Sequence, residues 1–412
     1  MRVLEILVLV PFMAHKALGI AIPSTKATVD QYPHTHQRTA LQAVNGNTKT
    51  SSWHLRNHAL QPAEAPLTGI HYGVAFLANI TFGTQEFPVV IDTGSSDTWL
   101  VKAGFTCVNR TTNATLPAST CGFGSRGYVP DDNFSEIPDE NFYTSYGDGE
   151  YLYGTLGLER VTFAGIEIQN QEVGLPLLAA WSGDGLSSGL AGLAYSSLTN
   201  AYPGTNSSND KISAGNVTGD NLPYSAIMNS IFVDNLAPPM FSLALSRSSA
   251  NISAGGVLAI GGIPHPDDPS INATGSFASS SSLVYHGVNA TSRQYIVDSG
   301  TSLMYVPTQD SEHINSLFDP PATVEGGLYL VDCNATAPYV GVQIGDKVFE
   351  LNPEDLIQNQ HIPGGICVSG IQTASTSLHI LGDTFLNNVL AVFDVGATEM
   401  AFSPRPFYTS NP

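Results

Sequence analysis

Positive charge is scarce in this sequence, because 15 Lys and Arg residues face 35 Asp and Glu residues and leave a net charge of −20. A protein that binds nucleic acid phosphates needs basic patches, so this shortage argues against a nucleic acid partner. Charged residues of both signs make up only 12% of the chain, whereas Gly, Ser, Thr, Val and Tyr are plentiful. The composition and length predict an all-β, turn-rich protein with room for two domains.

Long apolar runs are also missing, since no stretch reaches the ~20 apolar residues that a membrane-spanning helix needs. Residues 1–21 combine Arg2 with a shorter apolar run and small residues at its end, which predicts a secretory signal peptide. The C-terminal sequence SPRPFYTSNP carries no apolar tail, so no membrane anchor is expected. We therefore predict a secreted, extracellular protein, with a vacuolar location as the alternative.

Cysteine is rare, with 4 residues in the chain, and neither a CxxC pair nor a histidine cluster accompanies them. The sequence gives no support for a metal site, and we expect no cofactor. Four cysteines instead fit two local disulfides formed in an oxidising compartment. Several N-x-S/T sequons agree with secretion and predict a glycoprotein. They include Asn109, Asn113, Asn133, Asn216, Asn251, Asn272, Asn289 and Asn334.

The stretch FPVVIDTGSSDTWL (87–100) places one acid at the end of an apolar, β-branched run. This pattern predicts a buried strand that ends at Asp92 and continues into a tight, hydroxyl-rich turn. A buried carboxylate needs hydrogen-bond donors, which Thr93, Gly94 and Ser95 can supply without steric cost. Taken alone, the pattern also fits an ordinary turn or a helix cap.

A second copy of this pattern, YIVDSGTSLMYV (295–306), lies in the other half of the chain. An apolar run again ends in an acid, Asp298, and Ser299, Gly300 and Thr301 follow it. Such self-similarity at about half the chain length predicts two like lobes that each present one carboxylate. Two carboxylates that meet cannot both ionise cheaply, so the pair would share a proton and titrate as a unit.

With both motifs in place, the chain resembles the pepsin-like aspartic proteases from about Tyr72 to Ser403. Further matches are YGDG at 146–149, an apolar segment with glycine in each half, GGI at 261–263 and the cysteine placement. The resemblance implies an all-β, bilobal fold with the active-site cleft between two related β lobes. The implied division is a signal peptide at 1–21, a propeptide at 22–66, an N-terminal lobe at 67–242 and a C-terminal lobe at 243–412.

The same resemblance implies a secreted aspartic endopeptidase that works at acidic pH, with Asp92 and Asp298 as catalytic residues and an activated water between them. Hydrogen-bonding support for the dyad is implied for Thr93, Ser95, Ser299 and Thr301. The implied disulfides are Cys107 with Cys121 and Cys333 with Cys367.

The sequence FYTSYGDGEYLYGTLG (142–157) predicts a hairpin with a flexible tip, which in the family is the flap that closes over substrate. Tyr146 is then the flap tyrosine, and Trp99 is the indole that hydrogen bonds to it. Family members with an acid at the position of Asp148 accept Lys at P1 besides large apolar residues, and we expect the same here. Leu190 is implied as a wall of the P1 pocket, although core packing accounts for it equally well. The residues implied to bind the peptide main chain are Gly94, Gly147, Asp148, Gly300 and Ser302.

Residues 22–66 form a basic segment in an otherwise acidic chain, which by itself also fits a disordered arm. The resemblance implies an inhibitory propeptide that covers the acidic cleft at neutral pH, so the protein would be made as a zymogen. Its expected partners are polypeptide substrates, its own propeptide and pepstatin-type inhibitors, and it would act as a monomer. The basic residues of the segment are Lys26, Arg38, Lys49 and Arg56.

Other functions have weaker support. GLSSG (185–189) matches the nucleophile elbow of a serine hydrolase, with Ser187 as the nucleophile. Its Gly and Ser content fits an ordinary loop better. Asp383 is a third acid in the apolar-Gly segment of the second half, and in the family this residue is structural. The competing class is a non-catalytic pepsin-like protein that only binds ligands. Such relatives usually lose an Asp, the Gly or the flap Tyr, and all are present here.

Overall fold

The computed structural model describes residues 61–405 except 205–211, 214–215, 218–220, 249, 265–280, 286–287, 290–292, 346, 363 and 376. The predicted signal peptide and residues 22–60 of the predicted propeptide therefore lie outside the described residues. Within the described ranges, no helix has the length and hydrophobicity to cross a membrane.

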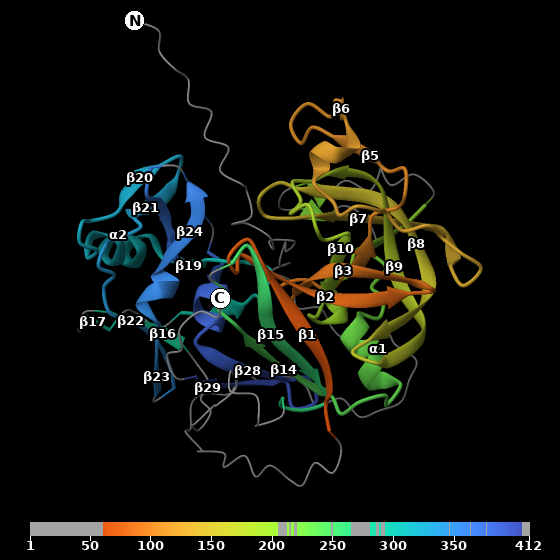
Figure 1. Ribbon diagram of the computed structural model, residues 1–412. Coiled ribbons are helices and arrows are strands. Elements are labelled where there is room, and N and C mark those ends of the chain that lie inside the picture. The colour runs from red at the N-terminus through yellow and green to blue at the C-terminus, as the bar shows by residue number, and fades with distance from the viewer. Residues whose placement is uncertain are drawn as a thin grey trace, which may run out of the picture.

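A central group of strands lies between two larger bodies of strands (Figure 1). The central strands are β1 (Ala63–Ile70), β14 (Met240–Leu245), β15 (Ile252–Ile260), β28 (Val389–Asp394) and β29 (Glu399–Pro404). β1 pairs antiparallel with β15 from Ala63 onward, so the boundary predicted at Pro66 falls inside this strand. The shared sheet thus takes strands from both ends of the described chain.

The first body of strands runs from β2 to β13 and, among its described residues, carries one α-helix. Its elements are β2 (Ala75–Phe82), β3 (Gln85–Asp92), β4 (Thr98–Leu100), β5 (Thr106–Val108), β6 (Thr115–Leu116), β7 (Ser135–Ser145), β8 (Tyr151–Phe163), β9 (Ile166–Ala180), β10 (Gly189–Gly192), β11 (Ala201–Pro203), β12 (Ile212–Ser213), β13 (Asn216–Val217) and α1 (Ile227–Val233). Its main strands continue the shared sheet in the order β11-β7-β8-β9-β4-β10-β3-β2-β1.

The second body of strands is built from small four-stranded sheets. Its elements are β16 (Ser281–Tyr285), β17 (Val288–Asn289), β18 (Tyr295–Val297), β19 (Met304–Val306), α2 (Thr308–Ser316), β20 (Thr323–Glu325), β21 (Leu328–Asp332), β22 (Val340–Ile344), β23 (Lys347–Glu350), β24 (Ile357–Ile362), β25 (Ile366–Ser369), β26 (Ile371–Thr373), β27 (His379–Leu381) and α3 (Asp383–Leu386). The mostly-β architecture confirms the predicted fold class.

The same three-strand arrangement surrounds both acid motifs. In the first lobe β3 ends at Asp92 and lies parallel to β10, with Gly192 opposite the acid, while β4 runs antiparallel to β10. In the second lobe β18 leads to Asp298 and lies parallel to β27, while β19 runs antiparallel to β27. In both lobes the last strand in the sequence therefore lies between the other two. The apolar-Gly segments read from the sequence are these inserted strands.

Candidate active site

The first acid motif wraps hydrogen-bond donors around its own carboxylate. At the end of β3, the Gly94 N–H donates to Oδ1 of Asp92 at 2.7 Å, and the Ser95 hydroxyl donates to Oδ2 at 2.5 Å. The Asp92 side chain is fully buried, so these donors replace the water that a carboxylate would otherwise bind. The chain after β10 holds this loop in place, because the Leu193 N–H donates to the Asp92 carbonyl at 2.8 Å.

The second acid motif repeats this geometry. The Gly300 N–H donates to Oδ1 of Asp298 at 2.9 Å, and the Thr301 hydroxyl donates to Oδ2 at 2.6 Å. Asp298 is also fully buried. Helix α3 supports the loop from its N-terminus, where the Asp383 N–H donates to the Thr301 carbonyl at 2.8 Å. The hydroxyls of Ser95 and Thr301 therefore occupy equivalent positions on the two carboxyl groups.

The two loops approach each other so closely that each glycine faces the opposite carboxyl group. A Cβ atom added to Gly94 would lie 2.6 Å from Cγ of Asp298, and one added to Gly300 would lie 2.6 Å from Oδ1 of Asp92. Real Cβ atoms do not occur at such distances, so the missing side chains allow this approach. The structure thus brings together two acids that stand more than 200 positions apart in the sequence.

Reciprocal hydrogen bonds join the two loops beneath the carboxyl groups. The Thr93 hydroxyl donates to the Val297 carbonyl at 2.9 Å and accepts from the Ser299 N–H at 3.0 Å. In the other direction, the Ser299 hydroxyl donates to the Ile91 carbonyl at 2.8 Å and accepts from the Thr93 N–H at 3.2 Å. Thr93 and Ser299 therefore cross-link the loops, and the smaller Ser hydroxyl performs the same task as Thr.

Burial raises the pKa of both acids. For Asp92, desolvation outweighs the hydrogen bonds from Ser95 and Gly94 that favour its charged form, so its pKa lies above the ordinary value. The pKa of Asp298 lies well above the ordinary value, first because of burial and second because of the neighbouring Asp92 charge. The two carboxyl groups therefore titrate as one coupled pair, in which one proton is retained when the other has left.

The predicted flap is the hairpin of β7 and β8. Its tip is closed by hydrogen bonds from the Tyr146 N–H to the Glu150 carbonyl at 2.8 Å and from the Gly149 N–H to the Tyr146 carbonyl at 2.9 Å. Oδ1 of Asp148 accepts from the Glu150 N–H at 2.9 Å. Nε1 of Trp99 donates to the Tyr146 hydroxyl at 2.8 Å, which is the contact that the resemblance implied.

Aromatic rings form an apolar wall beside the flap. The ring of Trp181 lies 5.2 Å from Trp99, 5.4 Å from Tyr146 and 5.9 Å from Phe123, measured between centroids. Leu190 has no exposed surface within this cluster. Its burial favours the core-packing alternative for this residue. The rings of Trp99, Trp181 and Tyr146 are themselves at most 5% exposed, whereas Phe123 is partly exposed.

The other residues predicted to bind the peptide main chain differ in exposure. Gly147 is exposed at the flap tip and Gly94 is half-buried, whereas Gly300 and Ser302 are buried. The Ser302 hydroxyl donates to the Val74 carbonyl at the start of β2. Gly147 and Gly94 are therefore open to an incoming chain, while Ser302 also ties the second acid loop to the first lobe.

Both predicted disulfides are confirmed. Cys107 and Cys121 are joined with a Cα–Cα distance of 5.9 Å, and Cys333 and Cys367 are joined with a distance of 5.0 Å. The first disulfide closes a loop beside the flap.

The nucleophile-elbow alternative has no support in the geometry. The Ser187 side chain is only 2% exposed, and its hydroxyl donates to Oδ2 of Asp184 at 2.6 Å. Its N–H donates to the other oxygen of the same carboxylate at 2.6 Å. Ser187 therefore stabilises a loop through Asp184.

One buried acid in the first motif was missed by the sequence analysis. Asp97 accepts hydrogen bonds from the Asn200 backbone and side-chain amides at 2.8 and 2.7 Å and from the Tyr224 hydroxyl at 2.7 Å. Burial nevertheless raises its pKa. Its place within DTGSSDTW was visible, but its partners lie more than 100 residues away in the sequence.

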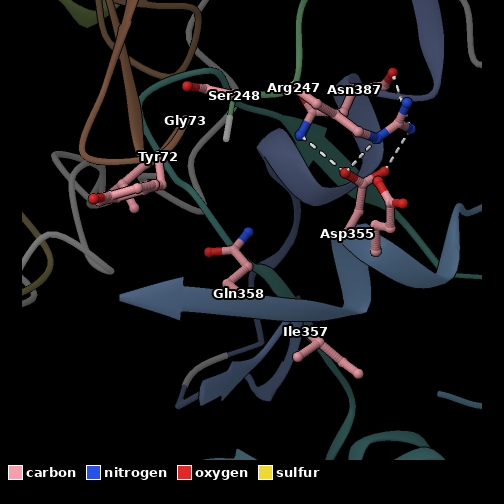
Figure 2. Close-up of a pocket in the computed structure, with 10 residues that line it drawn as sticks. Tyr72, Gly73, Arg247, Ser248, Asp355, Ile357, Gln358 and Asn387 are labelled. Carbon is pink, nitrogen blue, oxygen red and sulfur yellow. Dashed lines mark hydrogen bonds and ion pairs between the residues drawn. The ribbon is translucent and has the colours of Figure 1, made fainter. Parts of the chain in front are cut away.

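A pocket with a volume of about 280 Å³ lies at the junction of the lobes (Figure 2). At its edge the Arg247 guanidinium makes a bidentate ion pair with Asp355, with both N–O distances at 2.7 Å. Nη2 of Arg247 also donates to Oδ1 of Asn388 at 2.7 Å. Gln358 lines the pocket and donates to the Ser302 carbonyl at 3.2 Å. This network therefore borders the second acid loop.

Buried carboxyl groups predict a protein that is more stable in acid. A carboxyl group whose pKa is raised in the folded state binds more protons in the folded than in the unfolded state. Its stabilising contribution is complete below the unfolded-state pKa and is lost as the pH rises through the folded-state pKa. For an Asp side chain, this loss of stability starts near pH 3.8, the ordinary pKa of the group. The groups with raised pKa values are Asp92, Asp97, Glu159, Glu172, Asp298, Asp355 and Asp383.

We expect the melting temperature of the protein to be higher at pH 4 than at pH 7, by about 5–10 °C. Repulsion across the acidic surface adds to the effect at neutral pH. Thermal scans by circular dichroism at the two pH values measure the difference. A higher melting temperature at pH 7 would contradict this account of the buried acids.

Comparison with known proteins agrees with the geometry. A family profile described as eukaryotic aspartyl protease matches residues 75–405. A probable aspartic-type endopeptidase of Aspergillus fumigatus is 38% identical over 400 residues, which cover 88% of this chain and 86% of that protein. Rhizopuspepsin-2 of Rhizopus niveus is 25% identical, with 93% of this chain and 90% of that protein covered.

A solved structure shows the same fold. The crystal structure of aspartic proteinase from Irpex lacteus superposes with a TM-score of 0.63 at 20% sequence identity, covering 84% of this chain and 98% of that chain. The predictions of a pepsin-like fold and of an aspartic-type endopeptidase are therefore confirmed. The chain belongs to the eukaryotic aspartyl protease family.

Proposed function

We propose that Asp92 and Asp298 are the catalytic pair and that one water molecule is activated between them. The observation that carries this proposal is the mutual approach in which each loop glycine faces the opposite carboxyl group at 2.6 Å from an added Cβ atom. The ionised carboxylate takes a proton from the water as the water oxygen attacks the peptide carbonyl carbon, while the protonated carboxyl donates to the carbonyl oxygen. The tetrahedral gem-diol then collapses: the carboxyl that took the water proton gives it to the amide nitrogen, the other carboxylate takes a proton from a gem-diol hydroxyl, and the C–N bond breaks.

The surrounding hydrogen bonds keep this pair in the geometry that the reaction needs. Ser95 and Thr301 hold the outer oxygens, and Thr93 and Ser299 fix one loop against the other. Such preorganisation lowers the cost of reaching the transition state. Main-chain groups of the substrate are proposed to bind at the loops and the flap, through Gly94, Gly147, Asp148, Gly300 and Ser302.

An inhibitor experiment tests this mechanism against the alternatives. One equivalent of pepstatin per chain should abolish hydrolysis of denatured haemoglobin at pH 4, whereas EDTA and a fluorophosphonate should leave it unchanged. Inhibition by the fluorophosphonate would instead indicate a serine hydrolase. A chain that binds pepstatin but cleaves no peptide would be a non-catalytic binding protein.

The proposed P1 preference combines large apolar side chains with Lys. The rings of Trp181 and Tyr146 lie beside the flap and are each 5% exposed, and Phe123, which stacks on Trp181, is partly exposed. Asp148 brings a carboxylate to the flap tip, where a Lys ammonium at P1 could pair with it. The rings and the carboxylate thus favour different P1 side chains in the same cleft.

Asp148→Thr should abolish cleavage after Lys and spare cleavage after Phe, because Thr keeps a hydrogen-bonding group but loses the charge. The measurement is kcat/KM for two peptides that differ only at P1. Equal losses for the Phe and Lys peptides would show that Asp148 shapes the flap and not the specificity.

The chain is further proposed to be made as a zymogen and secreted as a monomeric glycoprotein. The basic composition of residues 22–66 complements the acidic remainder of the chain, and residues 1–21 have the charge and apolar pattern typical of a signal peptide. Acidification should release the segment, because protonation of cleft carboxylates weakens its attraction. Sequencing the new N-terminus after incubation at low pH tests this step.

A further inference from the structure

The loop closed by Cys107 and Cys121 forms a hydrogen-bonded turn beside the flap. The strands β5 and β6 pair with each other, and β5 also pairs with β9. Between them, Oδ1 of Asn109 accepts from the N–H groups of Thr111 and Thr112 at 3.0 and 2.9 Å. The turn is therefore held by its own hydrogen bonds, and Arg110 lies within it.

Arg110 reaches the tip of the flap. Its Nη1 donates to the backbone carbonyl of Asp148 at 2.8 Å and lies 3.6 Å from Oδ2 of the same residue. The Asp148 side chain is 2% exposed and that of Arg110 is 34% exposed. A second contact joins the same two segments, because the Tyr151 hydroxyl donates to Oδ1 of Asn113. The disulfide loop therefore holds the flap at the residue proposed to select Lys.

We propose that Arg110 is a positioning and specificity-determining residue, which holds the flap tip and competes with a P1 Lys for the carboxylate of Asp148. This inference rests on the proposed P1 specificity. The resident guanidinium already pairs with the carboxylate, so a Lys ammonium gains only the difference between the two pairings. An apolar P1 side chain does not use the carboxylate, so competition from Arg110 for this carboxylate does not affect its binding.

The hydrogen bond to the Asp148 carbonyl has a separate effect. It restrains the flap for every substrate, because the contact is with the backbone and does not depend on P1. Loss of the guanidinium should therefore raise KM for all substrates, while the ratio of kcat/KM between Lys and Phe peptides isolates the competition.

The test compares Arg110→Met and Arg110→Lys with the unchanged, acid-activated protein on peptides that differ only in Phe or Lys at P1. Arg110→Met should raise the Lys/Phe ratio of kcat/KM about twofold to fivefold, which is the range for a partly exposed ion pair. Arg110→Lys keeps the charge and should stay close to the original ratio. In Arg110→Met combined with Asp148→Asn, the gain should disappear.

Arg126→Met is the matched control. Arg126 belongs to the same lobe and is exposed, and it donates to the Glu86 carbonyl, away from the flap. The variant Arg126→Met removes the same charge as Arg110→Met and should leave the Lys/Phe ratio of kcat/KM unchanged. Thermal scans of each variant separate a specificity change from loss of the fold.

The failure of this inference is distinct from failure of the proposed function. An unchanged or lower Lys/Phe ratio in Arg110→Met, with Phe cleavage intact, would overturn the role of Arg110 alone. Absence of Lys cleavage in both the original protein and Arg110→Met would overturn the inference together with the proposed P1 Lys specificity. Absence of Phe cleavage by the original, acid-activated protein would overturn the proposed catalytic function itself.

Discussion

Asp92→Asn should lower kcat/KM by roughly 10²–10⁴-fold, the range over which a positioned acid or base contributes to catalysis. An amide cannot take a proton from the attacking water, so the step that generates the nucleophile is lost. The fold should survive, because an Asn oxygen can still accept from the Gly94 N–H and the change in volume is small. The measurement is steady-state hydrolysis of a P1 Phe peptide at pH 4.

Asp383→Asn provides the matched control for this variant. Asp383 is as fully buried as Asp92, and its pKa is raised well above the ordinary value by burial and by the two neighbouring acids. Its N–H supports the second acid loop at Thr301, and the backbone supplies this contact whatever the side chain. Asp383→Asn should keep kcat/KM within a few-fold of the original value. An equal loss in both variants would remove the distinction between catalytic and structural acids.

The second large effect is on stability. Arg247→Met should lower the free energy of unfolding by about 3–5 kcal/mol, because it leaves the buried carboxylate of Asp355 without its cation. The side chains of the pair are only 5% and 4% exposed, so water cannot replace the lost partner. Asn388 bridges the two residues, donating to Asp355 at 2.7 Å while it accepts from Arg247 at 2.7 Å. Urea unfolding at pH 6 measures the difference.

Arg126→Met again serves as the control, since removal of this exposed guanidinium, which lies over the Phe87 ring, should cost no more than about 1 kcal/mol. A second variant, Arg247→Met with Asp355→Leu, removes both charges and should recover much of the loss. If Arg247→Met unfolds at the same urea concentration as the original protein, the buried pair contributes little to stability.

The sequence was most informative where the chain repeats itself. The strand, acid and glycine pattern is local, so the turns around Asp92 and Asp298 could be predicted from neighbouring residues alone. The resemblance then implied the disulfides and the bond between Trp99 and Tyr146, and the structure contains these contacts.

Contacts between distant segments could not be predicted in this way. Arg110 lies in a polar loop whose sequence does not show that it faces the flap, and Arg247 pairs with an acid 108 positions away. The position of Leu190 also could not be decided from the sequence, because its pattern fitted a pocket wall and a core position equally well. The complete burial of Leu190 in the structure favours the core position.

The pH dependence of kcat/KM tests most directly whether one acid from each lobe shares a proton in catalysis. Initial rates on a P1 Phe peptide, with samples preincubated at each pH and also assayed at pH 4 to exclude unfolding, should give a bell with its maximum in the acid range. Its two limbs would report the ionisation of the coupled Asp92 and Asp298 pair. A single limb that rises toward neutral pH would contradict the shared proton.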